Sequence, residues 1–306
     1  MTKNRPVIIA GNYILDKYRF MGQDSDMSVF LKNLGFLFCM ILLTAPAAVQ
    51  SRIYPWLKKY DQTQSIAARI PVPRGYRRVE TQPGGFADWL RHLPLKPGKP
   101  PVYLYNGKRK ANQGAHFAVV DIDVGKRDLQ QCADAVMRLR AEYFYSIADF
   151  DAIHFNFTSG HKAEYKKWVD GYRPRVKGNR VRWAKSSKRN SSYPGFRRYL
   201  NVVFSYAGSY SLSQELHKVS DVSLMKIGDV FIQGGFPGHA ILVADMAVNG
   251  SGKKLFLLVQ SYMPAQEIHV LNNPVDSSLT PWYKLDFGEI LYTPEWTFTK
   301  NDLKRF

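Results

Sequence analysis

The order of helical and strand-like segments along the chain predicts an α+β fold rather than a doubly wound parallel sheet. Residues 76–123 mix strand-like and loop-like stretches, and a long helical pattern follows over residues 129–146. A basic segment and a second helical pattern over residues 196–206 come next, and the last third of the chain is rich in strands. Helices and strands that are segregated in this way pack as an antiparallel sheet with helices against it. We therefore expect one α+β domain over residues 76–306.

Two further segments complete the predicted organisation. Residues 51–75 form a lead-in that Pro71, Pro73 and Gly75 bring to an end. Residues 147–227 separate the long helix from the C-terminal strands, and we expect them to be a large insertion in the domain.

The clearest local signal is the start of the helix at residues 129–146. Asp128 is a favourable N-cap residue, and Gln131 three positions later completes a capping-box pattern. The apolar positions recur at helical spacing and are Leu129, Cys132, Val136, Leu139 and Tyr143. Cys132 therefore falls in the first helical turn. The unpaired N–H groups and the helix dipole there are expected to lower the pKa of its thiol.

Strands are predicted by β-branched and aromatic content. They cover residues 101–105, 116–123, 228–233, 239–248, 255–262 and 268–271. Asn249-Gly250 is a favoured two-residue hairpin turn, which would place His239 directly opposite Gln260 on one face of the sheet. Ser251-Gly252 offers a competing bend. A slip of two residues keeps the two side chains on one face, whereas a slip of one residue separates them.

The first 50 residues predict an exported protein. Leu34–Leu43 is an unbroken apolar run that follows Lys32 and precedes small residues. The run suits the hydrophobic core of a signal peptide and is too short for a membrane span of about 20 residues. We expect a wrongly assigned start, a signal from Met27 to about Gln50, a periplasmic or extracellular location and no transmembrane span in the mature chain. An uncleaved N-terminal membrane anchor is the alternative.

Charge and cysteine content narrow the partners and cofactors. The net charge is +18, and residues 1–50 hold five basic and three acidic residues, so the remainder carries +16. In an exported protein this charge favours an anionic cell-wall or envelope polymer as partner, and no nucleic acid. Cys132 alone remains after loss of the signal, which excludes an intrachain disulfide.

Metal and cofactor sites are not expected. His116, Asp121 and Asp123 lie on one predicted strand, but alternation places the two carboxylates on the face opposite His116. A single cysteine cannot build a zinc site of several thiolates. We therefore predict neither a metal centre nor a cofactor.

Three residues carry the catalytic hypothesis. Cys132 at a helix start is the nucleophile, His239 at the entry of a strand is the base, and Gln260 on the next strand orients the imidazole ring. The alternative is structural: Cys132 as a small core residue, His239 as a loop histidine and Gln260 as a satisfied core amide.

Two other segments supply candidate substrate-binding residues. Tyr262 and Gln266 lie in a break that follows the strand of Gln260, where they would wall a cleft. Trp183 lies in the segment Arg173–Asn190, which has eight basic residues and no acidic one. This segment is either a solvated loop or hairpin, or a surface on which Trp183 grips an anionic glycan or phosphate.

Several stretches resemble known families. QCADAVMRLRAEY is similar to the nucleophile helix of NlpC-type, papain-like cell-wall peptidases, and GDVF followed by PGHAILVAD is similar to the segment that carries their histidine. More of the chain resembles domain-of-unknown-function family 4846, a family of secreted bacterial proteins, through DLQQCADAVMRLRAEY, IHFNFTSG, GDVFIQGG and QSYMPAQ.

The peptidase resemblance implies a papain-like core, with an antiparallel sheet packed on the helix that bears the nucleophile. Cys132, His239 and Gln260 match its nucleophile, base and third polar position. The implied function is an exported cysteine hydrolase, an amidase or peptidase of the cell envelope. A non-catalytic envelope-binding protein with a buried, inert Cys132 is the alternative.

Overall fold

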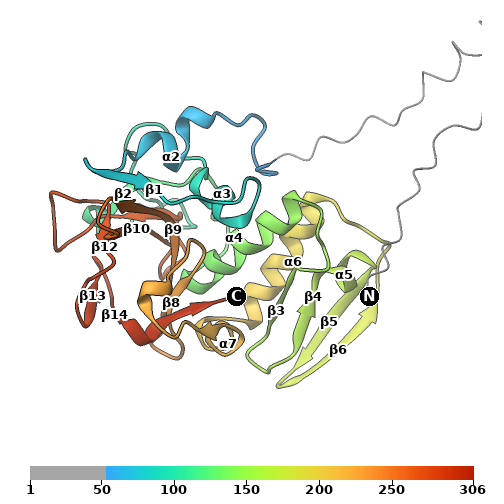
Figure 1. Ribbon diagram of the computed structural model, residues 1–306. Coiled ribbons are helices and arrows are strands. Elements are labelled where there is room, and N and C mark those ends of the chain that lie inside the picture. Colours follow the sequence, from blue (N-terminus) through green and yellow to red (C-terminus); the bar gives the residue numbers. More distant parts are fainter. Residues whose placement is uncertain (1–52) are drawn as a thin grey trace, which may run out of the picture. The chain divides into compact units, whose positions relative to one another are not determined.

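Nine strands form one antiparallel sheet at the centre of residues 53–306, the part of the chain that the computed structural model describes (Figure 1). Their order is β2 (His116–Val119), β11 (His269–Leu271), β10 (Lys254–Gln260), β9 (His239–Asn249), β8 (Val230–Gln233), β15 (Leu303–Arg305) and β7 (His217–Lys218). Two short strands extend it, β1 (Tyr76–Arg78) beside β9 and β12 (Tyr283–Lys284) beside β10. The predicted signal, residues 27–50, lies outside the described residues.

Outside the central sheet, the described residues form three two-stranded hairpins, six α-helices and four short 3₁₀-helices, over Gln62–Gln64, Gln113–Ala115, Val222–Leu224 and Lys300–Asp302. The hairpins are β3 (His154–Asn156) with β4 (Lys162–Glu164), β5 (Tyr172–Lys177) with β6 (Arg180–Lys185), and β13 (Ile290–Tyr292) with β14 (Thr297–Thr299). The helices are α2 (Ile66–Arg69), α3 (Phe86–Arg91), α4 (Cys132–Ser146), α5 (Tyr165–Val169), α6 (Tyr193–Tyr206) and α7 (Ser209–Glu215). The expectation of an α+β fold is therefore confirmed.

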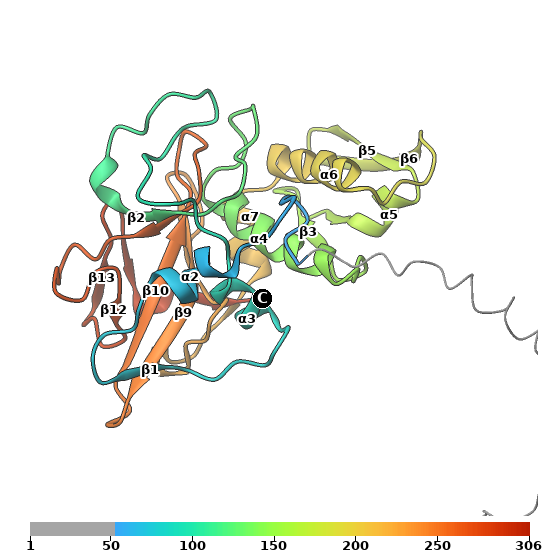
Figure 2. The same ribbon diagram turned by 90° about the horizontal axis from the view of Figure 1, so that it is seen from above.

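Helix α4 is the central helix of the fold. It packs against β9, with the sheet on one side and α6 and the β3–β6 hairpins on the other (Figures 1 and 2). Its buried face joins the main apolar core through Val136, Met137 and Leu139. No helix among the described residues is long and apolar enough to cross a membrane. The packing of α4 brings its first turn to the end of the sheet where β9 begins.

Helix α4 begins three residues later than the sequence predicted. Gln131 is its N-cap and Cys132 its first helical residue, and the backbone N–H of Gln131 donates to Asp134 Oδ2 at 3.1 Å. Asp128 instead accepts hydrogen bonds from the backbone of Ala265 at 2.7 Å and from the Gln131 side chain at 3.0 Å. The predicted cap residue thus ties the helix start to the loop that follows β10.

The turn between β9 and β10 is longer than the predicted two-residue turn. The backbone N–H of Asn249 donates to the carbonyl of Lys253, and Asn249 Oδ1 accepts from the backbone N–H groups of Ser251 and Lys253. Gly252 has φ +80°, a conformation that favours glycine. The competing bend at Ser251-Gly252 is therefore part of the turn, and the prediction of a turn at Asn249-Gly250 alone is wrong.

A β-bulge returns the side chains of His239 and Gln260 to the same face of the sheet, which the longer turn alone would not allow. Leu255 pairs with Ala247, three residues from the partner that the predicted turn gives it, and this odd displacement would put His239 and Gln260 on opposite faces. The bulge between Leu257 and Leu258 reduces the displacement to two, so that Val259 pairs with Leu242. His239 and Gln260 therefore share a face, offset by two residues.

Other predicted elements differ in extent. The stretch 101–105 makes only isolated bridges, Tyr103 to Arg109 and Leu104 to Gln266, because its backbone bonds go to loops. The stretch 116–123 forms a strand only over β2. The basic segment 173–190 forms most of the β5–β6 hairpin.

Candidate functional site

Cys132 lies at the start of α4 beside the start of β9. Its side chain is 5% exposed and contributes to a cavity of about 310 Å³, together with Gly238, Phe236, Ser209 and Met263. The backbone N–H of Ala240, the residue after His239, lies against the thiol and stabilises its ionised form. The structure thus brings the predicted nucleophile to a cavity at the entry of the strand that carries the predicted base.

The ionisation of Cys132 differs from the sequence expectation. Burial raises the pKa of the thiol to about 11, and the N–H donors of Ala240 and of the helix start offset only part of this effect. The expected lowering of its pKa is therefore wrong, because desolvation of a thiolate outweighs the helix N-terminus here. Near neutral pH the side chain is a thiol.

His239 is the first residue of β9 and is completely buried. Its ring lies among aromatic rings, with centroid distances of 4.8 Å to Tyr262, 5.3 Å to Trp296 and 5.9 Å to Phe298. Burial lowers the pKa of His239 to about 4, although its hydrogen bond to Gln260 acts in the opposite direction. The imidazole is therefore neutral at pH 7.

Gln260 hydrogen-bonds to His239 from the neighbouring strand. His239 Nε2 lies 2.9 Å from Gln260 Oε1, and Gln260 Nε2 lies 2.9 Å from Glu295 Oε2 and 3.3 Å from His269 Nε2. His269 lies on β11 directly opposite Gln260. The amide is therefore held on both of its polar atoms.

The partners of Gln260 fix which way its amide points. A carboxylate only accepts hydrogen bonds, so Glu295 requires the NH₂ group of Gln260 to face it. His269 Nδ1 lies 2.9 Å from the carbonyl of Glu267 and must donate to it, which leaves His269 Nε2 as a second acceptor for the same NH₂ group. Two independent acceptors thus turn the carbonyl oxygen of Gln260 toward His239.

The tautomer of His239 follows from this orientation. Because Gln260 offers an oxygen, His239 Nε2 must carry the proton and donate it, so that Nδ1 has a free lone pair. His239 Nδ1 is buried and has no hydrogen-bond partner among the described residues. Within the same part of the chain, no hydrogen bond joins Cys132 to His239. His239 is thus a neutral imidazole whose Nδ1 can still accept a proton, and the next residue, Ala240, contacts the thiol of Cys132.

Glu295 and Lys110 form a second layer behind Gln260. Glu295 Oε1 accepts from Lys110, whose ammonium group is buried and lies 5.3 Å from the ring centre of Tyr262. Glu295, Lys110 and His269 were not predicted from the sequence. Only His269 had a detectable signal, because hairpin pairing about the break after Gln260 places it opposite that residue.

The three predicted substrate-binding residues do not line the Cys132 cavity. Tyr262 packs edge-on against His239, and burial followed by the nearby Glu295 and Cys132 raises the pKa of its phenol. Gln266 is 1% exposed and donates to the carbonyl of Pro264 at 3.2 Å. Trp183 lies on β6 and donates to His161 Nε2 at 2.8 Å. The structure thus places Tyr262 against His239, whereas Gln266 and Trp183 contact neither Cys132 nor His239 through any hydrogen bond or ring contact of the described residues.

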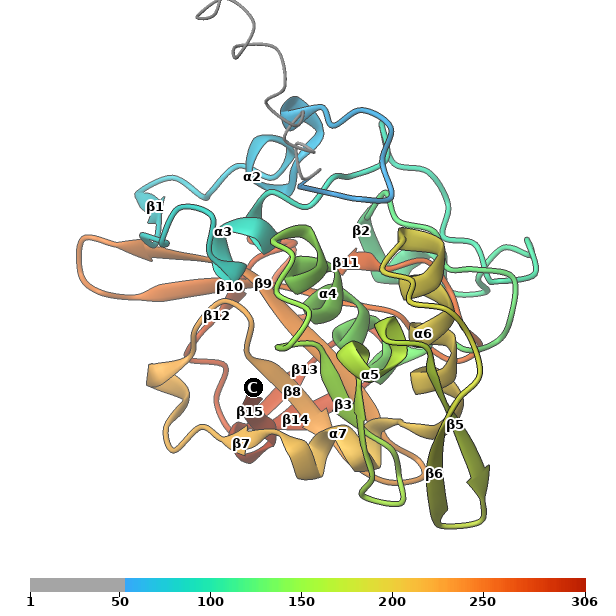
Figure 3. The ribbon, with the colours of Figure 1, turned by 90° about the vertical axis from the view of Figure 1, so that its right-hand side faces the viewer.

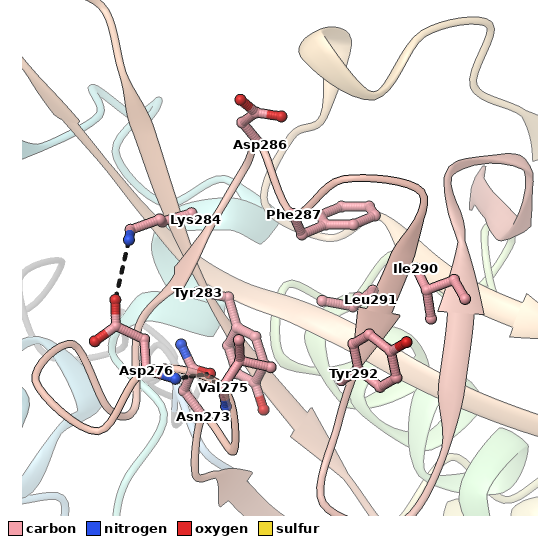
Figure 4. A pocket seen from close by; sticks show the side chains of 10 residues that line it. All are labelled: Asn273, Val275, Asp276, Tyr283, Lys284, Asp286, Phe287, Ile290, Leu291 and Tyr292. Carbon is pink, nitrogen blue, oxygen red and sulfur yellow. Dashed lines mark hydrogen bonds and ion pairs between the residues drawn. The ribbon is translucent and has the colours of Figure 1, made fainter.

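Another cavity, of about 330 Å³, lies beside β12 and β13 (Figure 4). Apolar side chains such as Val275 and Ile290 line it, and an ion pair of 3.0 Å joins Lys284 to Asp276 at its edge. Its lining contains neither cysteine nor histidine. It therefore offers neither of the two residue types, cysteine and histidine, that the catalytic hypothesis requires.

Comparison with known proteins gives one match. A family model described as domain of unknown function (4846) matches residues 66–305, which include α4, the whole central sheet and the β5–β6 hairpin. Neither the curated proteins nor the solved structures contain a match.

Proposed function

The chain belongs to the family described as domain of unknown function 4846, and from the geometry of its site we propose that it is a cysteine hydrolase that acts on an amide or ester. Cys132 is the nucleophile, His239 the base and Gln260 the residue that orients the base, in a papain-like arrangement. The observation that carries the proposal is the buried, unpartnered Nδ1 of His239, which Gln260 fixes as an acceptor. A buried polar atom without a partner in the free protein costs free energy, and a catalytic role accounts for it.

The raised thiol pKa and the lowered imidazole pKa define the form of the mechanism. The resting pair is a neutral thiol and a neutral imidazole rather than a thiolate and an imidazolium. As Cys132 Sγ attacks the carbonyl carbon, His239 Nδ1 accepts the thiol proton and then delivers it to the departing amine or alcohol. Water, activated by the same nitrogen, hydrolyses the thioester and releases the acid and the thiol.

The helix start supplies donors for the negative charge that develops on the substrate oxygen. The first N–H groups of an α-helix have no partner within the helix. Cys132 and Ala133 occupy these positions in α4, next to the nucleophile. Backbone donors aimed at a developing oxyanion contribute more than in water when the site is buried, as this one is.

The proposed setting is the cell envelope. The apolar run Leu34–Leu43 favours export to the periplasm or the exterior, and the positive charge favours contact with an anionic envelope polymer. The NlpC-type resemblance of the Cys132 and His239 segments points to amide bonds of the wall as substrates.

One observation favours a second function, a non-catalytic envelope-binding protein on the same scaffold. Cys132 is 5% exposed and makes no hydrogen bond to His239 among the described residues. A thiol that stays inaccessible in the folded protein would be a core residue.

Acylation by a small activated ester distinguishes the two functions. We expect p-nitrophenyl acetate to acetylate Cys132 in the folded protein, seen by peptide mass mapping. H239F should slow this step by about 10²- to 10⁴-fold, the usual contribution of a general base. In C132A the peptide that contains residue 132 should carry no acetyl group. Circular dichroism serves as the control for folding.

Two outcomes would contradict the proposed hydrolase mechanism. A thiol that is acetylated only after denaturation would show an inert core cysteine and support the binding protein. Equal acetylation rates in the wild type and in H239F would show that His239 is not the base.

A further inference from the structure

We propose that the β5–β6 hairpin binds a linear polyanion that carries phosphate groups, through a basic face formed by Arg175, Lys177, Arg180 and Arg182. This inference concerns a surface without the proposed catalytic residues, and it does not depend on the cysteine chemistry. Figure 3 shows the hairpin at the edge of the molecule, beyond α6.

The register of the hairpin gathers these cations on one side. Arg175 pairs with Arg182, and Lys177 pairs with Arg180, and directly paired residues lie on the same face of an antiparallel hairpin. All four side chains are exposed. The alternate pair, Val176 with Val181, is partly buried and packs against the core. The hairpin therefore has one face that holds it to the protein and one that presents four cations to solvent.

None of the four cations is neutralised by the part of the chain that the structure describes. No ion pair with Asp or Glu involves any of them, whereas other exposed cations do form such pairs, as Lys166 does with Asp151. Arg173 differs, because its guanidinium stacks on Trp168 at 3.8 Å and donates to the carbonyl of Trp168. The basic face is thus defined by the absence of internal partners.

The arrangement costs stability in the free protein. Like charges directly opposite each other on neighbouring strands repel and so destabilise the free hairpin. The hairpin contains two such pairs next to each other. The two adjacent pairs repel each other and have no internal counter-charge among the described residues. An external anion that supplied this counter-charge would relieve the repulsion.

The chemistry of the face selects the class of anion. Three of its four cations are arginines, whose planar donors bind phosphate in a bidentate manner. Successive cations on one strand lie about 6.7 Å apart, which favours an extended polymer over a single small anion. The turn residues Gly178 and Asn179 are polar or small and present no apolar side chain for insertion into a bilayer. These features favour a phosphate-bearing polymer over a membrane surface.

Salt-dependent binding of inorganic polyphosphate to the full chain tests the proposal. We expect the wild type to bind, with an affinity that falls steeply as salt rises. The variant R175Q/K177Q/R180Q/R182Q should bind at least about tenfold more weakly. Its slope of log affinity against log salt should be flatter by about 3 to 4, close to one per lost phosphate contact.

A matched variant controls for net charge. R74Q/R77Q/K108Q/R109Q also removes three arginines and one lysine, but from exposed positions elsewhere on the described surface. It should keep the wild-type slope. Equal weakening in both variants would show that only net charge matters and would overturn the proposal. It would also be overturned if the wild type failed to bind polyphosphate, or bound vesicles of anionic lipid more tightly than the polymer.

Discussion

The polar groups around His239 have partners within the protein, whereas the cations on the basic face of the β5–β6 hairpin have no acidic partner in the part of the chain that the structure describes. Around His239, every polar atom of Gln260 has a partner within the chain, and Glu295 is in turn bound by Lys110. On the hairpin, the four cations of the basic face have no acidic partner among the described residues. Each region therefore meets its proposed ligand at the groups that lack a partner in the described structure. The buried network is complete except for one acceptor, and the hairpin is incomplete along its whole face.

The largest expected difference in stability is between a buried and an exposed carboxylate. Asp245 on β9 is completely buried and is bound by Arg78 and Arg91, each at 2.7 Å. D245A should lower the free energy of unfolding by about 3–5 kcal/mol, because it leaves Arg91 buried without its counter-charge. Urea unfolding monitored by circular dichroism gives the value.

Asp151 provides the matched control, because it also forms an ion pair, with Lys166, but its side chain is 69% exposed. D151A should change the free energy of unfolding by no more than about 1 kcal/mol. Equal losses in the two variants would contradict the contrast between a closed buried network and a solvated surface.

The next effect is the response to acid. Burial lowers the pKa of His239 to about 4 and that of His269 to about 3, below the usual value near 6.5. The unfolded chain therefore binds protons that the folded chain does not. The stability from these two groups is complete above about pH 6.5 and is lost as pH falls toward their folded pKa values.

At pH 5 the loss amounts to on the order of 2 kcal/mol for each histidine. The thermal midpoint should fall between pH 7 and pH 5, and the ring resonances of both residues should not titrate over that range. Titration of His269 near pH 6.5 in the folded protein would contradict its burial. Polyanion binding to the basic face should behave differently. It should depend strongly on salt concentration and stay nearly constant between pH 7 and pH 5.

Local patterns in the sequence predicted the elements of the site, and contacts between distant segments decided its geometry. The helix at residues 129–146, the strand that begins at His239 and the strand that carries Gln260 each have a local periodicity. The register between those strands depends on a four-residue turn and a bulge at Leu257 and Leu258, which no short motif encodes.

The electrostatics of the site were the least predictable part. A helix start lowers a thiol pKa, but the degree of burial that raises the pKa of Cys132 depends on β9 and the loops around it. Glu295 lies 35 residues from Gln260 in the chain, and Lys110 lies 185 residues from Glu295. Separations of this size leave no periodic trace in the sequence.

The smallest expected effect on stability belongs to the hairpin, and it has an unusual sign. R175Q/K177Q/R180Q/R182Q removes two repulsive cross-strand pairs without removing any ion pair. The free energy of unfolding should therefore rise slightly, by about 0.4 kcal/mol for the two pairs together, the lower end of the usual range because exposed charges are screened. Differential scanning calorimetry at low salt measures the change as a small increase in the thermal midpoint.

The same comparison at high salt identifies the cause of that increase. At about 1 M salt the screening length falls to roughly 3 Å, so repulsion between exposed charges is nearly abolished. The wild type and the variant should then melt at the same temperature. A loss of more than about 1 kcal/mol at either salt concentration would instead show that the cations hold the hairpin in place. The contrast with the buried network would then fail, because both regions would be serving the fold.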